Sequence, residues 1–271
     1  MDARVQRRVQ RYGWDKAAAY YERFWARQLE PAQRRMLERA ALEPGNRVLD
    51  VACGTGLVTL PAAEAVGAAG SVLGTDISDE MVRSLQDAAS ARGLAQVSAR
   101  RMDAERLDVP DAAFDVALCA LGLMYVPDPL QALREMRRVL GPGGRVALAV
   151  WGARDRCGWA EIFPIVERRV ASEVCPLFFQ LGTGEALALN LEAAGFEGIT
   201  IERLSTTLVY ESGGDACGAA FAGGPVALAY DRFDGPTREA AHAEYLASIA
   251  RYRRGEAYLV PGEFVIGLAL R

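Results

Sequence analysis

Residues that usually bind metals or exchange protons near neutral pH are scarce in this 271-residue chain. It contains a single histidine, His242, and a single lysine, Lys16. Its five cysteines are scattered and form no Cys-x-x-Cys pair, which indicates neither a zinc site nor a framework of disulfides. We therefore predict that the protein holds no metal ion and that its cysteines are reduced thiols.

An excess of positive charge and long apolar runs are also missing. The formal net charge is −4, so no basic field attracts nucleic acid. No apolar run approaches the ~18 residues of a membrane-spanning helix. The arginines at the start of the chain are not followed by the apolar region of a secretion signal. We expect a cytoplasmic protein with no nucleic-acid partner and no membrane span.

Apolar sequence, in contrast, is abundant. Hydrophobic residues make up 51% of the chain, enough for the core of one large domain with insertions. Five apolar stretches of strand length alternate with helical patterns, which predicts an α/β fold with a parallel, doubly wound sheet covered on both faces. The first strand lies within Val48–Leu57, and the others are Ser71–Thr75, Gln96–Arg101, Phe114–Ala120 and Arg145–Trp151.

The first of these stretches contains a glycine turn between a strand and a helix. Gly54 and Gly56 let the backbone turn tightly against a ligand without a Cβ in the way. A dinucleotide fingerprint needs a third glycine or alanine, and Thr59 stands at that position. Asp50, before the turn, would repel a pyrophosphate and attract an ammonium group. The pattern favours a ligand with an amino group and no phosphate.

Asp50–Gly56 resembles the first motif of class I S-adenosylmethionine-dependent methyltransferases, and later segments resemble the other motifs of that family in the same order. These segments are Gly74–Ser78, Met102–Ala104, Phe114–Asp128, Leu140–Gly144 and Leu191–Phe196. The set is specific, although each member alone would be weak. The chain is similar to the small-molecule enzymes of ubiquinone and menaquinone biosynthesis. The resemblance implies a Rossmann-like, seven-stranded sheet whose last strand is antiparallel, with helical lid insertions.

The resemblance also implies which residues contact S-adenosylmethionine, whose product would be S-adenosylhomocysteine. Gly54 and Gly56 would pass under its methionine part, and the Ala52 carbonyl and the Asp50 carboxylate would serve its amino group. Asp76 would take the ribose hydroxyls, because a carboxylate can accept two O–H donors at once.

The adenine ring is expected beside the ends of the second and third strands. Ile77 would cover one face, Asp103 would accept the adenine amino group, and the Ala104 N–H would donate to a ring nitrogen. Asp76 and Asp103 could instead be acids that cap turns. Three further residues complete the expected cofactor site: Tyr20, Met81 and Cys119. Tyr20 or its neighbour Tyr21 would belong to a lid, although their spacing also fits a packed helix face.

The chain departs from the family pattern at the fourth motif. Met124 and Tyr125 stand where relatives often carry a histidine before Val126. Cys119–Gly122 lacks the Asn/Asp-Pro-Pro-aromatic sequence used on the amino groups of bases. With the negative net charge, this favours a small-molecule acceptor that has a hydrophobic or aromatic surface.

Catalysis requires mainly alignment of the nucleophile with an already activated methyl group, and a base if the acceptor carries a proton. Tyr125 and His242 are the candidate catalytic residues. The ordinary pKa of histidine suits proton transfer, yet His242 also falls on the apolar stripe of its helix, as a hydrogen-bonded core residue would. Other candidates near the site are Trp151, Asp155 and Glu161.

We predict four segments along the chain. They are an N-terminal helical lid (1–43), the cofactor-binding core (44–151), an acceptor-pocket insertion (152–182) and the end of the sheet with a second lid insertion at about 211–258 (183–271). In the first segment, we expect Asp15 to cap one helix and Pro31 to begin another. The connection Phe221–Pro225 is expected to be mobile.

The sequence thus predicts a methyltransferase that acts on a small molecule through an oxygen, nitrogen or carbon atom. One alternative is an NAD(P)-dependent oxidoreductase, disfavoured by Thr59 and by the absence of a Tyr-x-x-x-Lys pair. A second alternative is a subunit that binds S-adenosylmethionine without turnover. A homodimer is left open.

Overall fold

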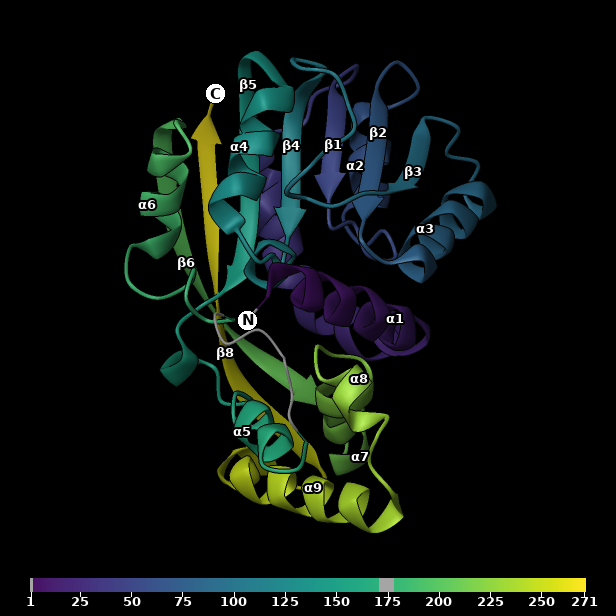
Figure 1. The fold of residues 1–271 in the computed structure, drawn as a ribbon, viewed down its shortest axis with the longest axis vertical. Helices are drawn as coiled ribbons and strands as arrows, with labels where there is room; N and C mark the ends of the chain where they lie inside the picture. Colours follow the sequence, from purple (N-terminus) through teal and green to yellow (C-terminus); the bar gives the residue numbers. More distant parts are fainter. Residues whose placement is uncertain (1, 171–177) are drawn as a thin grey trace.

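The computed structural model describes residues 2–170 and 178–271, which fold around one mixed sheet (Figure 1). The strand order is β3-β2-β1-β4-β5-β8-β6, and the two-residue β7 pairs with β8. The strands are β1 (Arg47–Val51), β2 (Ser71–Asp76), β3 (Val97–Arg101), β4 (Phe114–Ala120), β5 (Leu140–Trp151), β6 (Glu197–Tyr210), β7 (Arg253–Arg254) and β8 (Ala257–Leu270). Strands β1 to β5 are parallel, and β8 runs antiparallel to both β5 and β6. The predicted Rossmann-like sheet with an antiparallel last strand is confirmed.

Helices cover both faces of this sheet (Figure 1). They are α1 (Ala3–Ala40), α2 (Thr59–Val66), α3 (Asp79–Ala91), α4 (Pro129–Val139), α5 (Ile162–Glu167), α6 (Ala186–Ala193), α7 (Gly213–Cys217), α8 (Ala227–Tyr230) and α9 (Gly235–Ser248). The central strands are continuous apolar runs because neither face meets water: Val116, Ala117 and Leu118 of β4 are fully buried. The C-terminal part of α1 packs on this core.

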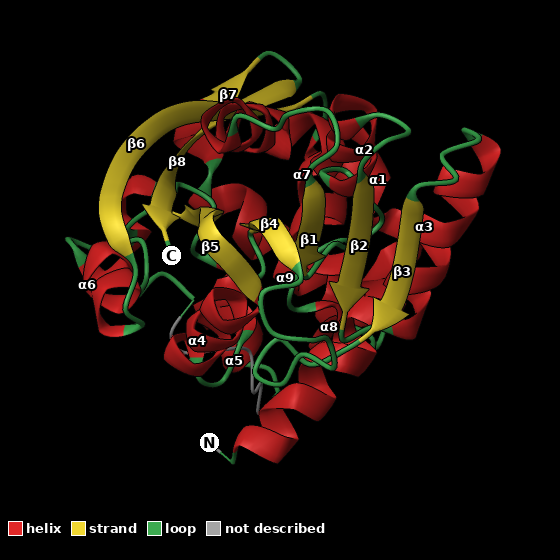
Figure 2. Ribbon diagram, turned by 90° about the horizontal axis from the view of Figure 1, so that it is seen from above, coloured by secondary structure: helices red, strands yellow, loops and turns green. Residues whose placement is uncertain are grey.

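Strands β6 and β8 extend past the carboxyl edge of the parallel strands. Residues Phe264–Leu270 of β8 lie between β5 and β6, whereas Leu259–Glu263 pair with β6 only and Tyr258 pairs with β6 and β7. Figure 2 shows this ribbon curving away from the parallel strands. Helix α7 contacts both strands of this ribbon, and α9 contacts α5 and α7. These three helices gather with α8 below the carboxyl edge in Figure 1. We call this group of helices, with its part of the ribbon, the cap.

The N-terminal segment differs from the prediction of two helices. It forms one helix, α1, whose N-cap is Asp2, and Pro31 lies inside it. Proline normally interrupts a helix, but here the residues around it are buried on the sheet, as Leu29 and Ala32 show. Asp15 does not cap α1. Its carboxylate instead accepts hydrogen bonds from Ser78 Oγ at 2.6 Å and from the Glu80 N–H at 3.2 Å, at the start of α3.

Other predicted boundaries are close to those observed. Ser78 caps α3, and its Oγ accepts a hydrogen bond from the Met81 N–H at 3.1 Å. Strand β5 is longer than predicted. The segment after β6 is helical, and Phe221 in its π-helical turn, Gly218–Ala222, is fully buried. None of the helices described has the length and apolarity that a membrane crossing requires.

Candidate functional site

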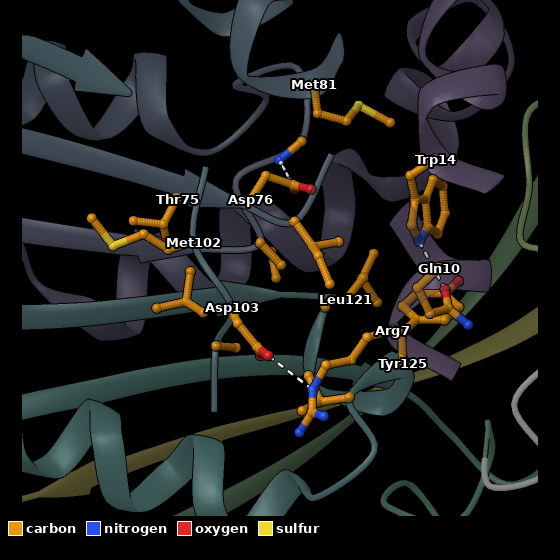
Figure 3. Close-up of a pocket in the computed structure, with 18 of the residues that line it drawn as sticks. Arg7, Gln10, Trp14, Thr75, Asp76, Met81, Met102, Asp103, Leu121 and Tyr125 are labelled. Carbon is orange, nitrogen blue, oxygen red and sulfur yellow. Dashed lines mark hydrogen bonds and ion pairs between the residues drawn. The ribbon is translucent and has the colours of Figure 1, made fainter. Parts of the chain in front are cut away.

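The carboxyl ends of β1, β2 and β4 open into a cavity that the N-terminal half of α1 closes from the other side (Figure 3). It encloses about 730 Å³, including solvent at its mouth. We call it the main cavity. Its walls come from five places along the chain: α1, the turn after β1, the segment that follows β2, the loop after β3 and the loop after β4. A cavity at the carboxyl edge of a parallel sheet is where such folds bind ligands.

The backbone at this edge adopts conformations that side chains rarely tolerate. Ala52 after β1 and Leu121 after β4 have φ of 57° and 62°, and both line the main cavity. Non-glycine residues with positive φ are uncommon and gather at functional sites. Gly56 has φ of 101°, and a Cβ on it would lie 2.7 Å from Cδ1 of Leu85. The turn therefore needs glycine at position 56 for packing as well as for its backbone.

Asp76 stands at the end of β2 and faces the turn after β1. Its Oδ2 accepts a hydrogen bond from the Gly54 N–H at 3.0 Å, and its Oδ1 accepts one from the Ser78 N–H at 2.9 Å. Burial raises the pKa of Asp76 to about 6, and the backbone N–H donors oppose that rise. Each carboxylate oxygen can accept a further bond, so Asp76 can receive two hydroxyl groups from a ligand.

Asp50, next to the carboxyl end of β1, is completely buried beside the same turn. Its Oδ2 accepts a hydrogen bond from Thr59 Oγ1 at 2.6 Å, whereas its Oδ1 has no partner within the described part of the chain. Burial raises the pKa of Asp50 to about 7. Asp50 lines a second, smaller hollow together with Ala52 and Gly54. A buried carboxylate oxygen without a partner, next to a glycine turn, fits a ligand that carries an ammonium group.

The start of α1 is held over the main cavity by ion pairs. Arg7 Nε lies 2.8 Å from Asp103 Oδ2, and its guanidinium also pairs with Glu105. Figure 3 shows Arg7 pointing at Asp103, and Trp14 beside Gln10. Arg11 pairs with Asp79 at 2.5 Å. These contacts bring α1 to the ends of β2 and β3.

A third hollow, which we call the aromatic hollow, lies next to the main cavity. Four residues line both: Trp14, Tyr21, Leu121 and Tyr125. The rest of its lining comes from the sheet, the C-terminal half of α1 and the cap: Trp25, Leu29, Trp151, Trp159, Phe178, Gly224 and Pro225. Tyr21 also lines the hollow of Asp50. It therefore stands where the three spaces meet.

The structure brings most of the predicted cofactor residues together. Those that line the main cavity are Ala52, Gly54, Asp76, Ile77, Met81, Asp103, Ala104 and the catalytic candidate Tyr125. Tyr20 is 47% exposed and lines none of the three spaces, whereas its neighbour Tyr21 lines all of them. Gly56 and Cys119 lie behind the lining, and burial raises the pKa of the Cys119 thiol to about 12.

His242 lies in the cap, away from these spaces. Its Nε2 is 2.9 Å from the hydroxyl of Tyr230, and its ring stacks on Tyr230 and packs against Phe221. Burial and the charge of Arg238 lower its pKa. It borders a separate hollow between α7 and α9. A role for His242 in proton transfer stays a prediction, and this position gives it no contact with the main cavity.

Sequence reasoning missed the cavity residues at the start of α1, which are Arg7, Gln10 and Trp14. A signal was present: Arg7, Trp14 and Tyr21 are seven residues apart, which places them on one face of a helix. The many arginines of this segment made the spacing hard to recognise as a helix face that lines a cavity. Thr59, which departs from the dinucleotide pattern, also donates a hydrogen bond from its hydroxyl to the Asp50 carboxylate.

Comparison with known proteins agrees with this geometry. Residues 48–144, which include β1 to β4 and the start of β5, match the model of a methyltransferase domain family. Residues 48–144 are thus similar to a methyltransferase domain, as the motifs of the sequence predict. Among curated relatives, aklanonic acid methyltransferase DauC of Streptomyces sp. (strain C5) is 35% identical over 134 residues, 49% of this chain and 61% of the relative.

A second relative is the ubiquinone/menaquinone biosynthesis C-methyltransferase UbiE of Ectopseudomonas mendocina (strain ymp). It is 45% identical over 111 residues, which are 41% of this chain and 43% of UbiE. The chain thus spans about half the length of the curated relatives it matches. Their shared part is the cofactor core, and the cap lies largely outside the matched domain.

A solved structure extends the likeness in fold. Haemonchus contortus phosphoethanolamine N-methyltransferase 2, in complex with phosphomonomethylethanolamine and S-adenosylhomocysteine, superposes with a TM-score of 0.62. The identity is 16%, over 95% of this chain and 58% of the other. At this identity the likeness concerns the fold alone. In the described ranges of the chain, no group of three or more histidine, cysteine, aspartate or glutamate side chains could hold a metal ion.

Proposed function

We propose that this protein transfers a methyl group from S-adenosylmethionine to a small molecule with an aromatic or hydrophobic surface. The observation that carries the proposal is the junction at Tyr21. There, the main cavity, whose lining includes Asp76 and Asp103, meets the aromatic hollow. A donor in the first space and an acceptor in the second would have their reacting atoms near this junction.

The residues of the main cavity fit the donor in three parts. Asp50 Oδ1, buried and without a partner in the described structure, would accept the ammonium group. Asp76 would accept the ribose hydroxyls, while the Gly54 and Ser78 N–H groups hold its carboxylate in place. Asp103 would accept the adenine amino group. When bound, S-adenosylmethionine supplies a methyl group already activated by a sulfonium.

The aromatic hollow supports alignment as the main contribution of the protein to the reaction. No carboxylate, imidazole or ammonium group belongs to its described lining. Tyr125, which lines both spaces and packs edge-to-face on Trp14 at 5.1 Å, is placed to orient an acceptor or take its proton. Excluding water and fixing the approach of the nucleophile can lower the barrier by several kcal/mol. The acceptor would enter through the cap, which we assign as the acceptor lid.

The structure disfavours the oxidoreductase alternative. Asp50 is buried against the turn that would hold a pyrophosphate, and the hydroxyl of Thr59 takes the place of the third glycine by bonding Asp50. A negative charge at this point opposes a diphosphate. A binding subunit without turnover shares every cofactor contact described above, so only an activity measurement separates it from an enzyme.

The proposal is tested with methyl-labelled S-adenosylmethionine and the full chain. We would incubate the protein with a panel of hydroquinones and aromatic polyketide acids and follow label entering each acceptor, with Asp76→Ala as the control variant. Transfer of label by the wild type, at least tenfold above that by the control, supports the proposal. Binding of the donor with no transfer to any acceptor, or to cell extract, would leave the binding-subunit alternative.

A further inference from the structure

The aromatic hollow contains two buried hydrogen-bond donors that no described residue satisfies. The side chains of Trp25 and Trp159 are only 5% and 3% exposed. Neither indole Nε1 has a hydrogen-bond partner in the described structure. A buried N–H left without a partner costs about 1–3 kcal/mol, and native proteins contain few of them. Two of them in the lining of one hollow therefore indicate a missing acceptor.

The surroundings of these donors place one of them at the hollow. Trp25 Nε1 lies 3.9 Å from where a Cβ on Gly224 would stand, and Gly224 is part of the lining. The rings of Trp25 and Trp159 are in contact at 6.1 Å between centroids, so the two indoles border the same space. A Cβ on Gly223 would lie 3.4 Å from Trp25 Nε1, so neither glycine places a side chain beside the buried indole N–H.

Trp14 provides the contrast within the same hollow. Its Nε1 donates to Gln10 Oε1 at 3.1 Å, so its hydrogen-bonding capacity is already used inside the protein. Trp25 and Trp159 lack such a residue. The difference separates an indole that only shapes the hollow from two that can recognise a ligand.

The chemistry of the lining limits the ligand class. The described lining holds aromatic and aliphatic side chains and no charged group, which favours a flat apolar ring system and gives no counter-charge to an amine. Indole nitrogens donate and do not accept. A ligand that satisfies both must present oxygen acceptors on an aromatic frame.

We propose that Trp25 and Trp159 determine acceptor specificity by donating their indole N–H groups to carbonyl or phenolic oxygens of an aromatic acceptor. The inference rests on the proposed function and narrows it to oxygenated aromatic substrates. Because an N–H bond to such an oxygen favours its anionic form, the same contact would help an acidic phenol or enol to release its proton to solvent without a carboxylate base in the hollow. The resulting oxygen anion would form a bond to the methyl group as the S–CH₃ bond breaks and S-adenosylhomocysteine leaves.

The test follows the four indole N–H resonances of the full chain labelled with ¹⁵N-tryptophan, in the presence of saturating S-adenosylhomocysteine. The probes are 1-tetralone and tetralin, which share a bicyclic frame and differ by one carbonyl oxygen. We expect 1-tetralone, and not tetralin, to move the Trp25 or Trp159 indole proton downfield. The Trp14 resonance, already bonded to Gln10, is the internal control.

Affinity gives a second readout. Trp25→Phe and Trp159→Phe keep an aromatic ring and remove the donor, so we expect one or both to weaken 1-tetralone binding about 3- to 10-fold and tetralin binding less than 2-fold. The matched control, Trp14→Phe, should leave the ratio of the two affinities unchanged. The wild-type resonances report on the proposal even if a variant fails to fold.

Three results would overturn the inference. They are equal effects of the substitutions on both probes, no change of either indole resonance, and no binding of either probe while S-adenosylhomocysteine binds. In each of these cases the proposed function stands, because donor binding is measured in the same sample. Loss of donor binding itself would instead refute the proposed function.

Discussion

Replacing Asp50 with asparagine should make the protein more stable and bind its cofactor more weakly. In the folded chain the Asp50 carboxylate is fully buried, with one oxygen bonded to Thr59 and the other without a partner in the described structure. An amide oxygen can keep the bond to Thr59. The negative charge, which serves only a bound ammonium group, is lost.

The size of the effect follows from the pKa of Asp50, which burial raises from 3.8 to about 7. At 1.36 kcal/mol per pH unit, holding the ionised group costs the folded state about 4 kcal/mol above pH 7. The new amide N–H₂ has no acceptor where the free oxygen stood, which costs about 1–3 kcal/mol. We therefore expect Asp50→Asn to gain about 1–3 kcal/mol in free energy of unfolding at pH 8.

The gain should depend on pH in a defined direction. Between pH 3.8 and about 7 the folded protein keeps a proton on Asp50 that the unfolded chain has released, so the stability conferred by this group falls as pH rises. The advantage of the variant should thus shrink as pH is lowered and be nearly gone at pH 5. Urea unfolding without cofactor at pH 5, 6, 7 and 8 measures it.

Cofactor affinity should change in the opposite sense. Loss of a charge-assisted hydrogen bond of about 1.5–3 kcal/mol corresponds to roughly 10- to 100-fold weaker binding of S-adenosylhomocysteine. Asp115→Asn is the matched control, because Arg47 lowers the pKa of Asp115 at a site outside the cavity. It should lose a little stability and keep its cofactor affinity. Destabilisation of Asp50→Asn at pH 8, or unchanged affinity, would refute this reasoning.

Three further changes test other parts of the site. Gly56→Ala should lower the free energy of unfolding in urea by about 2–4 kcal/mol, because φ at this position is 101° and the new Cβ would meet a leucine side chain at 2.7 Å. The control Gly45→Ala, with a φ of 89° and open space around it, should lower it by about 1 kcal/mol. Equal losses would contradict the packing argument. Arg7→Ala should remove the ion pair with Asp103, accelerate amide hydrogen exchange in the first turns of α1 and speed cofactor release a few-fold. Unchanged exchange would show that the ion pair does not stabilise the start of α1. His242→Ala should leave methyl transfer within 2-fold at pH 6–9, and a loss above 10-fold would give this residue a role in proton transfer.

The sequence predicted the parallel part of the fold because most strands there are short apolar runs that alternate with helical patterns. Asp50, Asp76 and Asp103 belong to or follow three such strands, and the carboxyl ends of parallel strands meet at one edge. The structure indeed brings these acids to that edge. The local sequence pattern was sufficient to predict where these acids lie, because the pairing of neighbouring parallel strands fixes the positions of their carboxyl ends.

The N-terminal helix could not be predicted in the same way. Arg7 reaches Asp103 and Arg11 reaches Asp79, contacts between residues far apart in the sequence. Pro31 looked like a helix start, but burial of the residues around it keeps α1 continuous. Such contacts depend on how the helix lies across the finished sheet.

The position of the cap could not be predicted from local sequence patterns either. The long pairing of β6 with β8 past the end of β5 carries it, and neither strand alone signals where its partner ends. Consequently, the sequence indicated that aromatic residues of this region, such as Trp159 and Phe178, form a pocket, but not that Trp25 of α1 shares its lining. Phe178 belongs to the described lining, and part of the predicted insertion, residues 171–177, lies outside the described residues.

The most direct test of the function is a calorimetric titration of the full chain with S-adenosylhomocysteine and, separately, with NADH. We predict saturable 1:1 binding of S-adenosylhomocysteine, weakened at least tenfold by Asp76→Ala, and no saturable binding of NADH. Saturable binding of NADH together with no binding of S-adenosylhomocysteine would contradict the assignment of the main cavity.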